Sequence, residues 1–114
     1  GNSMWIPEKQ KQFYSGVTDT LREYMASRYG ISAMEMTTAE IFDGMKSSDV
    51  PSDLLAVVKE LFERADFVKF AKYVASEEDN ASVLPVAVRF VTETYQAELE
   101  EEEAAATNET EGGE

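Results

Sequence analysis

The hydrophobic pattern near the start of the chain predicts a long amphipathic helix. Apolar side chains recur at steps of three and four, which places them on one face of an α-helix. They are Phe13, Tyr14, Val17, Leu21, Tyr24, Met25 and Tyr29. Pro7 suits a first helical position, and Gly30 supplies the left-handed residue that commonly follows a last turn. We therefore expect a helix from Pro7 to Tyr29.

A second, shorter helix is predicted after a connector. Residues 31–36 alternate weakly between apolar and polar side chains, so we expect an extended segment there. Thr37 and Glu40 stand three residues apart, as in a capping box, in which each side chain bonds the backbone N–H of the other residue. This pair is expected to start a helix that ends near Lys46.

Two further helical segments are predicted in the middle of the chain. The pattern after Pro51 indicates a helix over residues 52–64. Aromatic residues then follow at steps of three, at Phe67, Phe70 and Tyr73, and this spacing favours a helical turn over a strand.

The last apolar stripe predicts a helix whose start depends on Pro85. Its core-facing residues are expected to be Val83, Leu84, Ala87, Val88, Val91 and Tyr95. A helix that began at Ser76 would contain Pro85 in its interior, at a cost of about 3 kcal/mol. A start at Asn80 or Ser82 avoids this cost, so we expect a separate turn over residues 76–79.

These elements together predict an all-α fold, a compact bundle of four to five helices over residues 7–96. The pair of helices over 37–46 and 52–64 leaves open a helix-turn-helix-like centre. Residues 1–6 are interpreted as a cloning remnant and linker. Residues 97–114 contain acidic side chains without basic ones and lack an apolar stripe, so we expect an acidic disordered tail.

Charge argues against nucleic acid and anionic lipid as partners. The net charge is −13, and residues 1–96 account for −5 of it, with 15 acidic and 10 basic side chains. The basic residues are scattered singly, whereas affinity for duplex nucleic acid depends on clustered Lys and Arg. The helix over 52–64 carries acidic as well as basic residues, which argues against its use as a DNA-recognition helix.

The sequence contains no constellation for catalysis, for a metal or for a cofactor. Cysteine and histidine are both absent, which excludes thiol nucleophiles, the usual zinc sites and an imidazole base. The acids at 77–79 lack the spacing and glycine turn of a calcium loop and suit the start of a helix instead. We therefore predict a non-enzymatic protein–protein interaction domain.

The predicted partner-binding surface consists of Lys69, Lys72 and Tyr73. Cationic and aromatic side chains concentrate there on an otherwise acidic domain. Aromatic residues are enriched where proteins bind one another. A winged-helix or helix-turn-helix-like transcription regulator is the alternative function.

Parts of the chain also resemble a known family. The segments that carry the resemblance include Arg28-Tyr29-Gly30-Ile31, the run from Ala33 to Ile41, and Val68-Lys69-Phe70-Ala71-Lys72-Tyr73. Over residues 8–95 the chain is similar to the cytosolic part of BatD-like membrane proteins from Bat (aerotolerance) operons. The resemblance implies a domain on the cytoplasmic face of the inner membrane, anchored through a segment outside these residues. It implies a MoxR-type AAA ATPase or von Willebrand A proteins as partners, and it carries over no catalytic residue.

Overall fold

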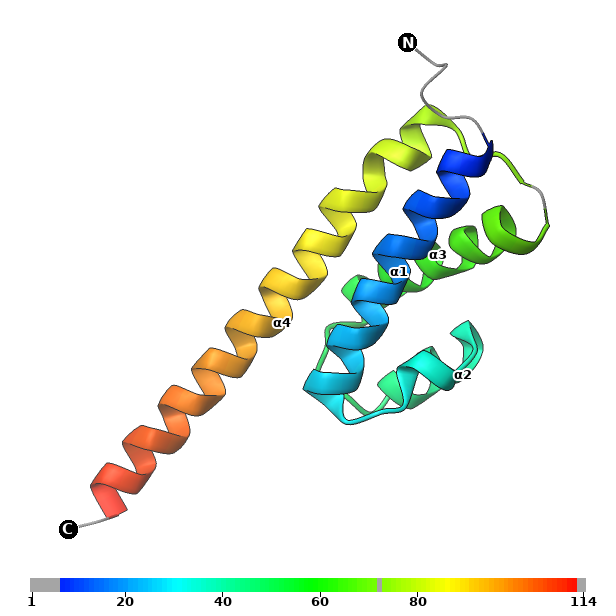
Figure 1. Cartoon of the computed structure of the whole chain (residues 1–114). Coiled ribbons are helices and arrows are strands. Elements are labelled where there is room, and N and C mark those ends of the chain that lie inside the picture. The colour runs from blue at the N-terminus through cyan, green and yellow to red at the C-terminus, as the bar shows by residue number, and fades with distance from the viewer. Residues whose placement is uncertain (1–6, 72, 113–114) are drawn as a thin grey trace.

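The computed structural model describes residues 7–71 and 73–112, and these residues form four α-helices (Figure 1). The helices are α1 (Pro7–Tyr29), α2 (Thr38–Met45), α3 (Ser52–Phe70) and α4 (Glu77–Gly112), with a 3₁₀ turn, η2 (Ala33–Glu35), between α1 and α2. No β-strand occurs in the two described ranges. The prediction of an all-α fold is confirmed.

The first helix has the predicted bounds because both of its ends carry the expected signals. Pro7 opens α1, and Gly30 follows it with a φ of 69°, in the left-handed region. The buried residues of α1 are Gln10, Tyr14, Thr18, Leu21 and Met25. Phe13 and Val17 are only half-buried, so part of the predicted apolar face lies outside the core.

The connection between α1 and α2 is a helical turn, so the prediction of an extended segment is wrong. Arg22 of α1 holds this turn, because its Nη1 donates to the carbonyl oxygens of Ala33 at 2.8 Å and Met36 at 2.6 Å. The capping box that starts α2 is confirmed. The Glu40 N–H donates to Thr37 Oγ1 at 3.2 Å, and the Thr37 N–H donates to Glu40 Oε1 at 2.8 Å.

The third helix runs without interruption to Phe70, so the predicted end near Arg64 is wrong. Ala65 and Val68 are buried, and the core-facing stripe of α3 therefore continues past Arg64. The helical turn predicted from Phe67 is present as the last turn of α3. Tyr73 lies beyond the end of the helix.

The fourth helix begins at Glu77, so the predicted start at Asn80 or Ser82 is wrong. Ser76 starts it, because its Oγ accepts the Asp79 N–H at 3.0 Å. Pro85 therefore lies inside α4. Proline cannot donate to the carbonyl oxygen of Ala81, but both residues lie on the exposed side of the helix, where water can bond that oxygen.

The helix also continues to Gly112, through residues that were predicted to be disordered. Ala and Glu, which dominate this segment, are strong helix formers. Arg28 offsets part of the repulsion among the acids, since Glu98 and Glu101 lie 3.4 and 3.7 Å from its guanidinium nitrogens. Residues 113–114 lie outside the described part, and the disorder predicted for residues 97–114 stays a prediction.

Three hydrogen-bonded pairs show that α1 and α4 lie side by side and run in the same direction (Figure 1). Two of them join α1 to α4, Tyr14 to Asn80 and Tyr24 to Thr94, and the third joins Gln10 of α1 to Ala75, two residues before α4 begins. From one pair to the next, the residue numbers increase on both sides, as parallel helices require. The α3 helix packs against both α1 and α4, and α2 packs against α3.

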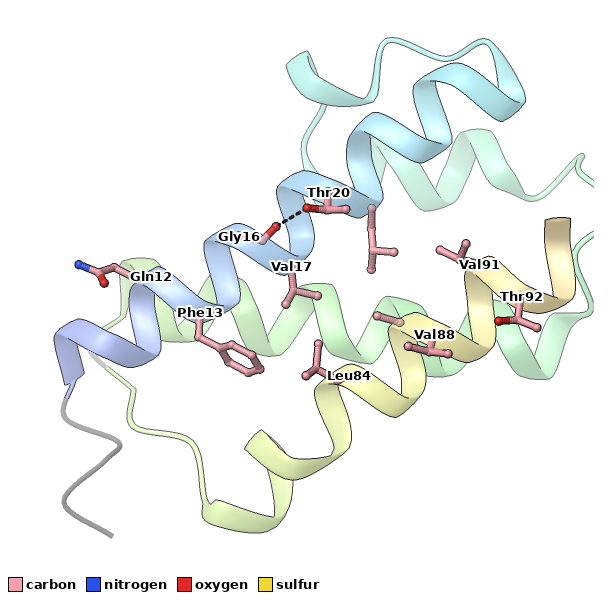
Figure 2. A pocket seen from close by; sticks show the side chains of 11 residues that line it. Gln12, Phe13, Gly16, Val17, Thr20, Leu84, Val88, Val91 and Thr92 are labelled. Carbon is pink, nitrogen blue, oxygen red and sulfur yellow. Dashed lines mark hydrogen bonds between the residues drawn. The ribbon is translucent and has the colours of Figure 1, made fainter. Parts of the chain in front are cut away.

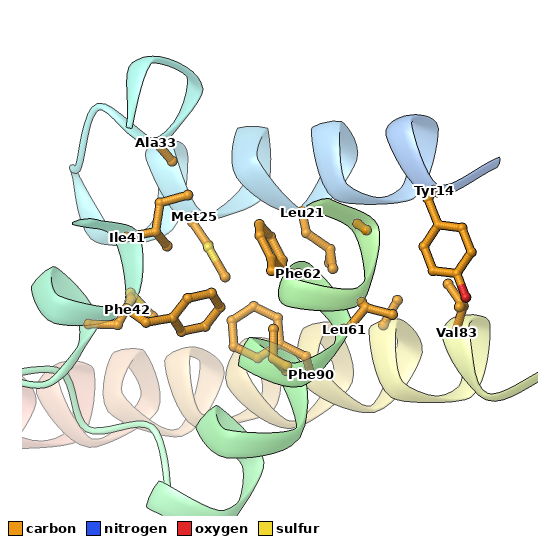
Figure 3. Packing of buried hydrophobic residues seen from close by; sticks show 14 of the residues in the cluster. Tyr14, Leu21, Met25, Ala33, Ile41, Phe42, Leu61, Phe62, Val83 and Phe90 are labelled. Atoms are coloured by element: carbon orange, nitrogen blue, oxygen red, sulfur yellow. The ribbon is translucent and has the colours of Figure 1, made fainter. Parts of the chain in front are cut away.

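The core lies where α1, α3 and α4 meet, with α2 closing one side (Figure 3). Leu21 and Met25 of α1 approach Phe62 of α3 and Phe90 of α4, and all four side chains are buried. Phe42 of α2 packs edge to face on Phe62, with ring centroids 5.2 Å apart. None of the described helices includes an apolar stretch long enough to cross a membrane.

Candidate functional site

One face of α4 exposes a row of large apolar side chains. Leu84, Val88 and Tyr95 are 53%, 61% and 52% exposed, and half-buried Val91 lies between them. Their spacing of four, three and four residues places them along a single face of the helix. Exposed apolar side chains that form a continuous row, unlike single ones, indicate a binding surface.

This row was predicted to face the core, and the structure corrects that prediction. On the neighbouring stripe of α4, the burial predicted for Val83 and Ala87 is confirmed, since both are buried against the other helices together with Phe90. Apolar residues cover more than half of the circumference of α4 in this region, so the sequence alone allows either stripe to face inward.

The exposed row forms one wall of a groove of about 600 Å³, and α1 forms the other wall. Figure 2 shows Phe13 and Val17 of α1 on one side of this groove and Leu84 and Val88 of α4 on the other. The polar residues of the lining are Gln12, Thr20 and Thr92, and none of them carries a charge. The groove can bury apolar surface, but it offers no acid, base or nucleophile of the usual kinds.

Gly16 keeps the α1 side of the groove open. A Cβ atom placed on Gly16 would meet no other atom within 4 Å, so the missing side chain leaves free space in the lining. The neighbouring Thr20 hydroxyl donates to the Gly16 carbonyl oxygen at 2.9 Å, as the dashed line in Figure 2 shows. Its hydrogen-bonding capacity is thereby directed to the helix backbone.

The groove continues along α4 and becomes acidic. Val91 and Thr92 also line a second hollow of about 410 Å³, which contains Leu99, Glu100 and Glu103. Within the described residues, neither of these two glutamates forms an ion pair with a Lys or Arg. The site is therefore apolar at the end where α4 begins and anionic at the other end.

The predicted partner surface lies elsewhere, at the end of α3 and just beyond it. Lys69 Nζ lies 3.5 Å from Thr18 Oγ1 of α1 and 5.8 Å from the centroid of the Phe70 ring. Tyr73 packs edge to face on Phe67, with centroids 6.3 Å apart. Lys72 lies outside the described residues. The structure thus brings Lys69 and Tyr73 to one end of the molecule, and this surface stays a prediction.

Phe70 lies beside that surface and is 79% exposed, although the sequence pattern did not indicate a partner contact for it. Phe67 and Val74 are also exposed there. The groove residues Gly16, Leu84 and Val88 were missed as well. The available signal was the excess of apolar positions on α4, which is more than one core-facing stripe requires.

The titratable groups with a shifted pKa have structural explanations. Burial raises the pKa of the Tyr14 hydroxyl, which donates to Asn80 Oδ1 at 2.9 Å. Hydrogen bonds from Thr37 lower the pKa of Glu40 in the capping box. No group of three or more acidic residues in the described ranges is arranged to hold a metal ion. These groups belong to the helix packing and lie outside the groove.

The α3 helix bears on the predicted alternative of DNA binding. Its exposed side chains include Asp53, Glu60 and Glu63 beside Lys59. This mixture provides no concentration of positive charge for a phosphate backbone. The helix-turn-helix function therefore gains no support from the exposed face of α3.

Comparisons with known proteins identify no relative of this chain. No protein-family model, no curated protein and no solved structure gives a significant match.

Proposed function

We propose that this domain is a non-catalytic protein-binding module that receives a helix of another protein in the groove between α1 and α4. The single observation that carries the proposal is the uncharged groove lined by Phe13, Val17, Leu84 and Val88. Ligand sites are typically concave and mostly apolar, with a few polar groups that fix orientation. Gln12 and Thr92 are suited to that orienting role.

The exposed apolar side chains provide a driving force for binding. Full burial of a Val or Leu side chain contributes about 1.5–3 kcal/mol. Leu84 and Val88 are still more than half exposed, so a partner that covers them gains about 1 kcal/mol from each. Partial contributions from Phe13, Val17 and Val91 add to this gain.

The cellular setting of the proposal comes from the sequence resemblance. Similarity to BatD-like proteins supports a place on the cytoplasmic face of the inner membrane, in a protein anchored by a segment outside these residues. In that setting a MoxR-type AAA ATPase or a von Willebrand A protein is the partner. A direct test is titration of the domain with each purified partner protein. Localisation is tested separately, with the intact anchored protein.

A designed peptide tests the groove without knowledge of the natural partner. The probe is an uncharged amphipathic helix of about 18 residues, roughly five turns, with leucine on one face and glutamine elsewhere. We expect it to shift the backbone NMR signals of Phe13, Val17 and Val88. A peptide of equal composition, with leucine distributed around the helix, is expected to leave these signals unchanged.

Two matched glycine substitutions provide the decisive comparison. Gly16→Leu fills the groove, and Gly44→Leu makes the same change on α2, away from it, where the nearest atom to a Cβ is 3.8 Å away. Both replace an exposed helical glycine, so both variants are expected to fold with equal or higher stability. Gly16→Leu should weaken peptide binding by about ten-fold or more, which is a loss of about 1.4 kcal/mol. Equal affinity of the two variants would disprove the proposed site.

A further inference from the structure

The geometry of the groove suits a helix as its occupant. The two walls are parallel helices, and each presents apolar residues at helical spacing, with Phe13 and Val17 on α1 and Leu84 and Val88 on α4. A third helix can place its own apolar ridge between such rows. The row on α4 extends to Leu99, and its length corresponds to about four helical turns of an occupant.

The charge along the groove then distinguishes the two ends of that occupant. Glu100 and Glu103 line the far end, whereas the lining between Phe13 and Leu84 is uncharged. Arg28, the cation in the last turn of α1, is already engaged by Glu98 and Glu101. The acidic end of the groove therefore requires its counter-charge from the partner.

We propose that the partner segment is an amphipathic helix with an apolar face and with Lys or Arg at the end that lies over Glu100 and Glu103. This inference rests on the proposed protein-binding function and specifies the chemistry of its ligand. The apolar ridge contributes most of the affinity. The terminal cations fix the direction in which the helix lies in the groove, as charges at the rim of an interface commonly do.

A second copy of this chain fits the same groove poorly. An antiparallel pairing of two α4 helices about Val88 and Val91 would bring Glu100 of one copy toward Asp79 of the other. A parallel pairing would place Glu100 and Glu103 against the same residues of the second copy. Either arrangement adds like-charge repulsion between chains that each carry a net charge of −13.

The test compares peptides that differ only at their ends. Each peptide keeps the leucine face of the uncharged probe. Three residues at one end are lysine, glutamate or glutamine. Each of these peptides is made in two versions, one altered at the N-terminal end and one at the C-terminal end. We expect one lysine-ended peptide to bind about ten-fold tighter than its glutamate-ended counterpart in low salt, with the difference reduced at high salt. The dissociation constants are measured by fluorescence anisotropy.

A charge-reversal pair locates the effect on the protein. Glu100→Lys with Glu103→Lys should reverse the preference, so that the glutamate-ended peptide binds more tightly. The control is Glu60→Lys with Glu63→Lys, which has the same spacing and charge change on exposed positions of α3. The control should retain the preference for lysine, because those residues lie outside the groove.

The outcomes separate this inference from the function on which it rests. Equal binding of all end variants, together with loss of binding in Gly16→Leu, would overturn the charge inference and leave the groove as a helix site. Failure of every peptide to perturb the groove would remove the proposed function as well. Self-association in sedimentation experiments that Gly16→Leu abolishes would identify a second copy as the occupant and overturn the inference.

Discussion

Gln10 is a buried polar side chain that completes the backbone hydrogen bonding of another segment. Its Nε2 donates to the Ala75 carbonyl oxygen at 3.0 Å, and its Oε1 accepts the Ala75 N–H at 3.0 Å. Ala75 is itself buried in the connection between α3 and α4. Unpaired backbone groups at this depth are costly, so Gln10 fixes the position of the connection against α1.

We predict that Gln10→Leu lowers the free energy of unfolding by about 2 kcal/mol, because both backbone groups of Ala75 lose their partner. Leucine has a similar size, so the loss reports hydrogen bonding more than packing. Gln12→Leu is the control, since it makes the same change at an exposed position of α1, where we expect an effect within about 0.5 kcal/mol. Urea denaturation measures both values, and equal stability of the two variants would contradict the role of Gln10.

At the scale of the elements, the sequence predicts helix ends where a local signal sets them. Pro7 and Gly30 define α1, and the capping box of Thr37 and Glu40 starts α2, because each signal acts through its own backbone. Ser76 is a similar signal. Pro85 favours a later start, but Ala81 and Pro85 both lie on the exposed side of α4, where an interior proline is tolerated.

The sequence could not predict which faces of the helices meet. On α4 the buried stripe through Val83 and Phe90 and the exposed row through Leu84 and Val88 have similar hydrophobicity. Their separation depends on where α1 and α3 pack, and the position of α1 depends on the Gln10 and Tyr14 hydrogen bonds. The groove is therefore a property of tertiary packing, as is the continuation of α3 past its predicted end.

Glu101, in the part of α4 that projects beyond the other helices, interacts with the carboxyl group of Asp49. A hydrogen bond and charge repulsion from Asp49, in the turn between α2 and α3, raise the pKa of Glu101, and Arg28 partly opposes this shift. A carboxyl with a raised folded-state pKa favours folding in its protonated form. Its contribution is therefore present at low pH and is lost as the pH rises through that raised pKa.

We predict that Asp49→Asn increases the protection of the amides of residues 97–103 from hydrogen exchange at neutral pH, because Glu101 no longer faces a second carboxylate. The gain over the unmodified chain should shrink as the pH falls from about 7 to about 4, where the carboxyls become protonated. Asp43→Asn, at an exposed position of α2, is the control and should leave α4 unchanged. A pH-independent gain would show that repulsion at Glu101 is not its cause.

The whole molecule is elongated because α4 extends past the other helices. The principal extents are 64 × 29 × 21 Å, and Figure 1 shows the C-terminal end of α4 projecting beyond α1, α2 and α3. The buried residues of α4 end at Thr94, while its exposed apolar row and acidic residues continue to Leu99 and Glu103. Folding and binding thus depend on different lengths of the same helix.

Two truncations should distinguish the part of α4 that folding requires from the part that is proposed to bind the partner. Removal of residues 104–114 is expected to leave the midpoint of thermal unfolding and peptide affinity unchanged, because residues 104–107 are exposed and line neither part of the groove. Removal of residues 97–114 should also preserve most of the stability, since it deletes the ion pairs of Glu98 and Glu101 with Arg28 and the hydrogen bond between Glu101 and Asp49. Ion pairs near the surface contribute little to stability. It eliminates Glu100 and Glu103, however, so the preference for a lysine-ended peptide should disappear while the uncharged peptide still binds at Leu84 and Val88. If the shorter chain retained the lysine preference, the acidic end of α4 could not be its source.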